Sequence, residues 1–320
     1  MVTNLAVFEV IILLLPFLTK YGQCRGIWDD GPTYLEVSNL VLEKGKPLVV
    51  QQNSTQLQIK GLNGTLYSDS LSQLSQVSDL KIFINQIIDI ETGAICSAPK
   101  LKRFEIDLSY NAHAPVLTKN MFEGCDNLEE LFLVGNYDNL TTLDSDALQS
   151  LPNLKYLYIR NFNLKHLTQD YFKGLKSLTN LTLFRCSIEE IDSNAFVGLA
   201  NLEEVRFEFN GFERLPNSLF KNTPKLVNLL LFGNNITNLT WDEFDGLASL
   251  ERLELIRNQI NTFDGNKITK FMPNLKVLLI EFKTLECDQR KKLNNYDEYA
   301  GSHEVLFLYK FGFDPDSCES

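Results

Sequence analysis

Residues 178–191 read LTNLTLFRCSIEEI, and residues 226–239 read LVNLLLFGNNITNL. Both stretches have apolar residues at their first, fourth, sixth and eleventh positions, with Cys or Asn at the ninth. The pattern recurs, with small departures, from Leu154, Leu202 and Leu250, so that five consecutive units start 24 residues apart. A fixed period of this length is typical of a solenoid in which each repeat forms one turn.

Less regular units extend this series in both directions. Earlier units begin at Leu128, Leu101 and Val77, a later one begins at Leu275, and the segment around Leu57 is a degenerate first unit. We therefore expect about ten turns. A second apolar column runs in phase with the first and consists of Phe122, Leu148, Phe172, Phe196, Phe220, Phe244 and Ile268.

Each unit contains a short strand, because alternate residues of an L-x-L sequence point to the same side. Stacked turns pair these strands and bury the leucines, and the phenylalanine column fills the opposite half of the coil. The ninth residue then points inward, where an Asn amide satisfies backbone groups of neighbouring turns. These ladder positions hold Asn85, Asn136, Cys186, Asn210, Asn234 and Asn258. Ser109, Phe162 and Lys283 break the pattern, and we expect a local distortion at Phe162.

This pattern resembles the leucine-rich-repeat family in its extracellular 24-residue form, over roughly Leu57 to Leu285. The resemblance implies an α/β repeat solenoid, shaped as a horseshoe with a parallel β-sheet on its concave side. We also expect a disulfide-linked cap at the C-terminal end, because the last turn of a solenoid otherwise exposes its core.

The first residues have the character of a secretory signal. An apolar run from Leu5 to Leu18 is short for a membrane span, and small residues precede a cleavage site that we place near Cys24. An uncleaved anchor is the alternative. The predicted organisation is a signal peptide at 1–24, an N-terminal cap with the degenerate repeat at 25–76, repeats at 77–285 and a C-terminal cap at 286–320. We expect a secreted protein without a membrane span.

The six cysteines divide by their place in the repeats. Cys186 occupies a ladder position and is expected to be a buried thiol. Cys96 and Cys125 lie on the return segments of adjacent turns, close enough to form a disulfide. Cys287 and Cys318 bracket the tail after the last repeat and are expected to close the cap.

Composition and motifs point away from catalysis and from nucleic acid. The formal net charge is −11, and no basic stripe accompanies it. The three histidines lie in no nucleophile motif, and no metal-type Cys or His pairs, P-loop or dinucleotide fingerprint occur. We therefore predict a non-enzyme with no cofactor and no metal.

Outward-facing positions of the predicted strands carry many aromatic residues and arginines. Exposed aromatic patches usually mark an interface, and Tyr, Phe and Arg are enriched at interface cores. The alternative is that neighbouring rings simply pack on one another. The predicted partner-binding residues are Phe132, Tyr156, Tyr158, Arg160, Phe184, Arg185, Arg206, Phe209, Phe232 and Arg257.

Six N-x-S/T sequons predict glycosylation in a secreted protein. They lie at Asn53, Asn63, Asn139, Asn180, Asn235 and Asn238. Asn180 falls on the predicted concave face, where a glycan would obstruct a partner.

The runs IFINQIIDI (82–90), ICSAPKL (95–101) and FEGCDNL (122–128) are similar to the leucine-rich immune proteins of mosquitoes. Because residues 288–320 have no heptads, the similarity is to the members that lack a coiled coil. It implies innate-immune recognition, with a complement-like extracellular protein or a microbial surface as partner. The alternatives are a signalling module or ligand trap of the Toll-like ectodomain type, and a secreted inhibitor or matrix protein.

Overall fold

The structure is a computed structural model that describes residues 35–50, 54–263, 267–281, 285, 287–288 and 306–307. The predicted signal peptide and Asn53 lie outside these residues. No helix in the described part has the length and apolar character needed to cross a bilayer.

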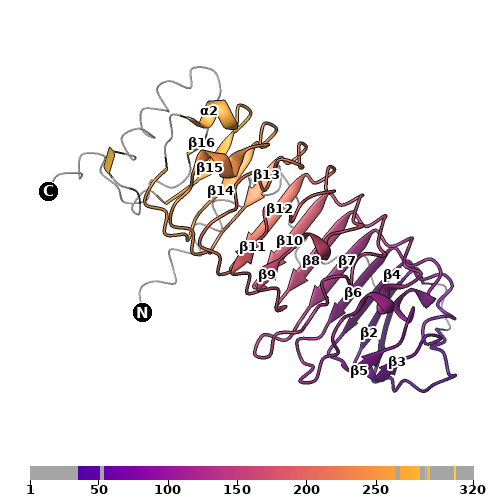
Figure 1. Ribbon diagram of the computed structural model, residues 1–320. Helices are drawn as coiled ribbons and strands as arrows, with labels where there is room; N and C mark the ends of the chain where they lie inside the picture. The colour runs from indigo at the N-terminus through magenta and orange to yellow at the C-terminus, as the bar shows by residue number, and fades with distance from the viewer. Residues whose placement is uncertain are drawn as a thin grey trace. The chain divides into compact units, whose positions relative to one another are not determined.

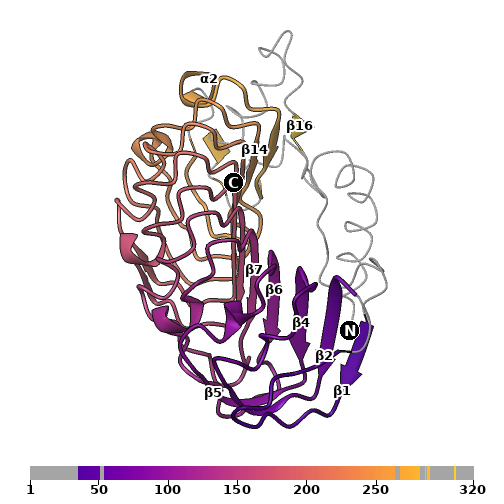
Figure 2. The ribbon, with the colours of Figure 1, turned by 90° about the vertical axis from the view of Figure 1, so that its right-hand side faces the viewer.

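The described residues form a solenoid whose strands line up side by side in one parallel sheet (Figure 1). This sheet lines the inner side of the curve, and the return segments lie on the other side (Figure 2). The 12 strands are, in spatial order, β1 (Leu35–Ser38), β2 (Gln56–Lys60), β4 (Asp79–Phe83), β6 (Arg103–Asp107), β7 (Glu130–Val134), β8 (Tyr156–Arg160), β10 (Asn180–Phe184), β12 (Glu204–Glu208), β13 (Asn228–Leu230), β14 (Arg252–Glu254), β15 (Val277–Leu279) and β16 (Leu306–Phe307).

The strand register follows the 24-residue period. Leu181 pairs with Leu157 on one side and with Val205 on the other, and Val205 pairs with Leu229. All four side chains are completely buried. The predicted parallel sheet with stacked leucines is confirmed. Strand pairing begins earlier than the sequence predicts, since β1 lies within the segment assigned to the N-terminal cap.

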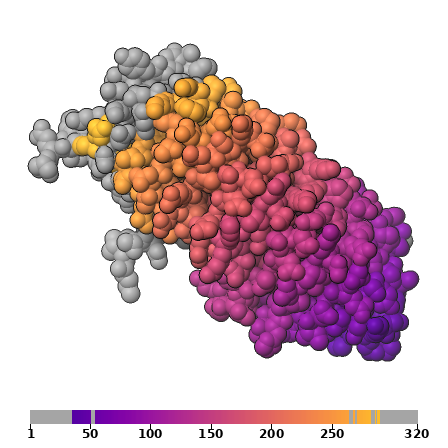
Figure 3. All heavy atoms as spheres, in the orientation of Figure 1, coloured from indigo at the N-terminus to yellow at the C-terminus, as the bar shows by residue number. Residues whose placement is uncertain are grey.

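The return segments are mostly short 3-10 helices and extended segments. They include η1 (Ile95–Ser97), η2 (Lys119–Phe122), η3 (Gln169–Tyr171), η4 (Trp241–Phe244), the four-residue helix α2 (Ile268–Phe271), and two small parallel sheets made by β3 (Asn63–Leu66) with β5 (Gln86–Ile90) and by β9 (His166–Leu167) with β11 (Glu190–Ile191). The phenylalanine column lies beneath them, and the Phe196 ring centroid is 6.0 Å from that of Phe172 and 5.8 Å from that of Phe220. Neighbouring turns are in contact along the whole solenoid (Figure 3).

The asparagine ladder forms as predicted in the later turns. The Asn210 side chain accepts a hydrogen bond from the Cys186 N–H at 2.8 Å and donates one to the Leu183 carbonyl at 3.0 Å. Asn234 repeats this with the Asn210 N–H at 3.1 Å and the Phe207 carbonyl at 2.7 Å. Each amide therefore joins its own turn to the preceding one and satisfies backbone groups that are buried from water.

The expected distortion at Phe162 is wrong. Phe162 is fully buried at the ladder position, and the backbone ladder continues beside it, where the Asn161 N–H donates to the Phe184 carbonyl at 3.1 Å. The irregularity lies in the two preceding turns. There the Asn136 side chain accepts bonds from Asp138 and Asn139 in its own loop.

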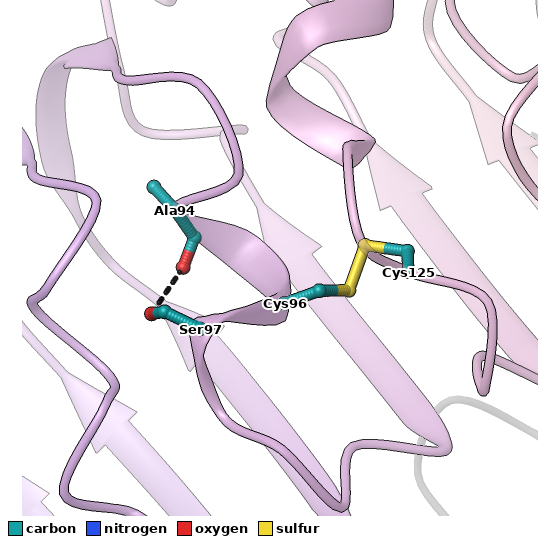
Figure 4. Close-up of a disulfide and its surroundings, with 4 residues drawn as sticks. All are labelled: Ala94, Cys96, Ser97 and Cys125. Carbon is teal, nitrogen blue, oxygen red and sulfur yellow. Dashed lines mark hydrogen bonds between the residues drawn. A yellow bond between two sulfur atoms is a disulfide. The ribbon is translucent and has the colours of Figure 1, made fainter.

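Cysteine chemistry follows the predicted division in the described residues. Cys96 and Cys125 form a disulfide with a Cα–Cα distance of 5.1 Å, which links the return segments of adjacent turns (Figure 4). Cys186 is a buried free thiol, and burial raises its pKa to about 12. Cys287 is disulfide-bonded, while its predicted partner, Cys318, lies outside the described residues.

Candidate functional site

The sheet has one face toward the leucine core and one face toward the concave side of the solenoid. The predicted partner-binding residues lie on the concave face or at its edge. Strand side chains alternate between the leucine core and this face, so each five-residue strand of the sheet from β2 to β12 contributes its first, third and fifth residues. On β4 and β6 these residues are largely charged, whereas β7 and β8 contribute three aromatic residues among six. The face is therefore divided along the solenoid into regions of different chemistry.

Phe132, Tyr156 and Tyr158, on β7 and β8, form a tyrosine cluster. The Phe132 ring centroid lies 5.2 Å from that of Tyr156 and 6.1 Å from that of Tyr158. Arg103 covers the other side of Phe132, with its guanidinium carbon 4.0 Å from the ring centroid. Phe132 is only 6% exposed, and burial raises the pKa of Tyr158 to about 12. This cluster is closely packed, as the alternative interpretation of ring-on-ring packing predicts.

Phe184, Phe209 and Phe232 form a second group, the phenylalanine row, at the edge where the strands end. Phe184 is the last residue of β10, and its ring centroid lies 5.3 Å from that of Phe209. Phe209 in turn lies 5.1 Å from Phe232. Both contacts are edge-to-face, which is a favourable arrangement for aromatic pairs. All three rings are half-buried, so part of each remains accessible.

Three arginines, Arg160, Arg185 and Arg257, stack on this row and are referred to below as the arginine set. Arg160 lies 5.2 Å from the Phe184 centroid, and Arg257 lies 5.3 Å from that of Phe232. Arg185 bridges two rings, at 5.4 Å from Phe184 and 5.3 Å from Phe209. Contacts of this kind are attractive because the cation faces the negative side of the ring.

Residues with a left-handed backbone conformation position part of the phenylalanine row and of the arginine set. The residue before the ladder position has a positive φ in most turns, including Arg185 at 52°, Phe209 at 54° and Arg257 at 58°. Gly233 takes the same place in the intervening turn, at 71°. The chain turns out of the strand at these residues, which places their side chains at the sheet edge rather than on the leucine side.

Arg206 does not join the aromatic groups. Its Nε lies 2.7 Å from a Glu204 carboxylate oxygen, and its Nη1 lies 4.0 Å from Glu208. Burial raises the pKa of Glu208, and the like charges of Glu254 and Glu204 raise it further. The predicted role of Arg206 as a partner-binding residue therefore competes with an ion-pair network within the sheet.

Sequence reasoning missed two residues beside the site. Arg103 lies in a less regular unit, so its place over Phe132 had no clear signal. Tyr137 follows β7 in a loop, is 62% exposed and lies 5.4 Å from the Arg185 guanidinium. Its position depends on loop geometry that the repeat pattern does not specify.

The sequons differ in accessibility. Asn139, Asn235 and Asn238 are exposed. Asn180 is half-buried on β10, and its side chain accepts a hydrogen bond from the Thr179 hydroxyl at 2.8 Å. Asn63 is also half-buried, on β3, and donates to the Gly61 carbonyl at 3.2 Å. Within the described ranges, no three His, Cys, Asp or Glu side chains gather in a way that would hold a metal ion.

The parallel sheet and the side chains on its concave face define a repeat protein whose turns together form one continuous surface. The sequence matches the BspA-type leucine-rich repeat region, in six copies, over residues 51–179 and 100–227, and a further leucine-rich repeat pattern over residues 200–260. The chain therefore belongs to the leucine-rich-repeat proteins. No curated protein sequence matches it.

Solved structures of two receptors have a similar fold. One, TLR13 in a complex with ssRNA13, gives a TM-score of 0.63 at 20% identity and covers 88% of this chain and 43% of the receptor chain. The other, a glycosylated Toll–Spätzle complex of Drosophila, gives a TM-score of 0.55 at 17% identity and covers 74% and 35% of the two chains. This chain therefore spans less than half the length of either receptor structure. At these identities the likeness concerns the fold alone.

Proposed function

We propose that this chain is an extracellular, non-enzymatic binding protein that holds a protein partner on the phenylalanine row and its arginines. The observation that carries the proposal is the row itself: three half-buried rings of which Phe209 contacts the other two, each stacked by at least one arginine. Rings and guanidiniums that are already held in place lose little conformational freedom on binding, which favours affinity.

An extracellular location is supported by two independent features. The apolar run from Leu5 to Leu18 has the character of a secretory signal. The Cys96–Cys125 disulfide is a bond that persists in oxidising compartments and is rare in the cytosol.

The similar structures support a binding role by analogy. One of these receptors is in complex with the protein Spätzle, and the other is in complex with ssRNA13. We favour a protein over a nucleic acid for this chain because its formal net charge is −11.

Within this class we propose innate-immune recognition, with a complement-like protein or a microbial surface as partner. The support is the similarity of residues 82–90, 95–101 and 122–128 to the leucine-rich immune proteins of mosquitoes. A signalling module or ligand trap of the Toll-like ectodomain type is the second candidate, and the similar folds favour it. A secreted inhibitor or matrix protein is the third.

Affinity capture tests the proposal. Purified protein is immobilised, exposed to the extracellular fluid of the source organism, and the retained proteins are identified by mass spectrometry. We expect the wild type to retain a partner that the Phe184→Ala/Phe232→Ala variant loses. Tyr110→Ala serves as the control, since it removes an exposed ring from the turn after β6.

The retained protein also decides between the candidates. A complement-like protein supports the immune role, whereas a growth factor or a protease supports the second or third candidate. Equal retention of the partner by both variants and the wild type would place the interface elsewhere on the solenoid.

A further inference from the structure

The arginine set has unused hydrogen-bonding capacity. Neither Arg185 nor Arg257 has a salt-bridge partner among the described residues, although both lie over aromatic rings. The Arg160 side chain bonds to the Tyr158 hydroxyl, and its buried Nε has no hydrogen-bond partner in the described part of the chain. By contrast, Arg206 on β12 forms a salt bridge, with its Nε 2.7 Å from a Glu204 carboxylate oxygen.

Stacking leaves the edge of a guanidinium free. The ring covers one face of the planar group, while its N–H donors point outward in the plane and match a carboxylate in a two-bond arrangement. Three arginines held in this way form a row of preorganised anion sites.

The local charge differs from that of the whole chain. The molecule has a formal net charge of −11, whereas the arginine set contributes three positive charges along one edge. The carboxylate nearest in register is Glu208, which pairs with Phe184 across the strands and faces Arg206 at 4.0 Å. The arginine set is therefore a positive strip on an acidic protein, and an acidic ligand would be directed to it.

We infer that the arginine set binds an extended acidic segment of the protein partner, with an apolar side chain of that segment on the phenylalanine row. This inference rests on the proposed function and adds the chemistry of the ligand. Carboxylates would pair with the guanidinium edges, and the apolar side chain would cover the accessible part of the rings.

Strand order gives the spacing of the acidic groups. The strands β8, β10, β12, β13 and β14 are consecutive neighbours, so Arg160 and Arg257 are four strand steps apart. At about 4.8 Å a step this is about 19 Å, which an extended peptide of about seven residues spans. A peptide that runs across the strands places its first and third residues near Arg160 and Arg185, its fifth near Phe232 and its seventh near Arg257.

The test uses a synthetic peptide with this spacing, Glu-Ser-Glu-Ser-Leu-Ser-Glu, capped at both ends and labelled for fluorescence anisotropy. We expect measurable binding that weakens as salt is added, and at least a ten-fold weaker Kd for Arg185→Gln/Arg257→Gln. The control variant, Lys173→Gln/Lys221→Gln, removes the same charge from exposed return-segment positions and should bind like the wild type. The Arg185→Lys/Arg257→Lys variant keeps the charge and should fall between the two.

Several results would overturn the inference. These are the absence of peptide binding, equal binding of a peptide with Gln in place of each Glu, or equal weakening by the lysine control. Tighter, arginine-dependent binding of heparin than of the peptide would replace the acidic segment with a sulfated glycan. If Arg185→Gln/Arg257→Gln still captures the natural partner while Phe184→Ala/Phe232→Ala does not, the proposed function stands and only this inference fails.

Discussion

The turns at residues 154–263 and the turns at residues 101–143 share one leucine core but are joined to their neighbours differently. In the later turns, each ladder amide bonds backbone groups of the preceding turn in both directions. In the earlier turns, Asn136 still donates to the Ser109 carbonyl at 2.9 Å, but its oxygen accepts from its own loop. A disulfide between Cys96 and Cys125 joins the first of these turns to the turn before it on the return side.

Chain length explains the difference. Strand register advances by 27 residues from Arg103 to Glu130 and by 26 from Glu130 to Tyr156, compared with 24 in the later turns. The additional residues form loops that compete for the ladder amide. The period thus determines which bonds can repeat, while the leucine column tolerates the insertions.

The largest expected effect tests whether the core is the same in both regions. Leu181→Ala and Leu133→Ala each open a cavity at a completely buried site, and each should lower the free energy of unfolding by about 2–5 kcal/mol. Urea denaturation followed by circular dichroism measures both. A much smaller loss for Leu133→Ala would show that the earlier turns are loosely packed as well as irregular.

The disulfide is the next test, because only the earlier turns depend on it. Cys96→Ala/Cys125→Ala releases a link with a sequence separation of 29, and we expect a loss of about 2–4 kcal/mol. Hydrogen exchange should accelerate around η1 and η2 and remain unchanged beyond residue 154. Acceleration spread evenly over the solenoid would mean that the two regions unfold as one unit.

The ladder amides should differ in their contribution to stability. Asn210→Ala leaves buried backbone groups unpaired and should cost about 1–3 kcal/mol. Asn136→Ala should cost about 1 kcal/mol or less, since Asn136 is half-buried and water can replace its bonds. Equal losses in thermal or urea unfolding would contradict the distinction between the regions.

The last expected effect concerns pH and only the later turns. Burial raises the pKa of Glu243 from 4.5 to about 7, and its carboxylate accepts a hydrogen bond from the Thr240 N–H at 2.6 Å. Because the folded-state pKa of Glu243 is above its unfolded value, the folded state is favoured while this carboxyl is protonated. That contribution to the free energy of unfolding is fully present below pH 4.5 and is lost as the pH rises through about 7. The melting temperature should therefore fall across this window, and Glu243→Gln should reduce the slope. Asp242→Asn, at an exposed position of the same η4 helix, should leave it unchanged.

The repeating part of the fold could be predicted from sequence because its contacts repeat with the period. Leu181, Asn210 and Phe196 take the predicted environments since each meets equivalent residues one turn away. β1 was missed because LEVS at 35–38 stands outside any recognisable unit. Phe162 was misjudged because the preceding Asn161 supplies an amide, which donates to the Gly135 carbonyl at 3.3 Å.

At the candidate site, the sequence predicts which strand residues face outward but not which side chains they contact. Alternation along a strand indicates that Tyr158 and Phe184 face outward, and they do. It does not indicate that Phe132 is almost covered, or that Arg206 turns to Glu204 instead of an aromatic ring. Those outcomes depend on side-chain rotamers and on neighbours a full turn away, for which a single sequence gives no direct signal.

The left-handed residues before the ladder have a consequence for protein engineering. Arg185, Phe209 and Arg257 hold a backbone conformation that glycine adopts with less strain, as Gly233 does in the turn between them. Replacing any of the three by glycine therefore removes a large side chain and at the same time lowers the strain in the backbone. The proposed binding function and the stability of the fold favour different residues at these positions, so a variant that loses the proposed binding can keep its stability.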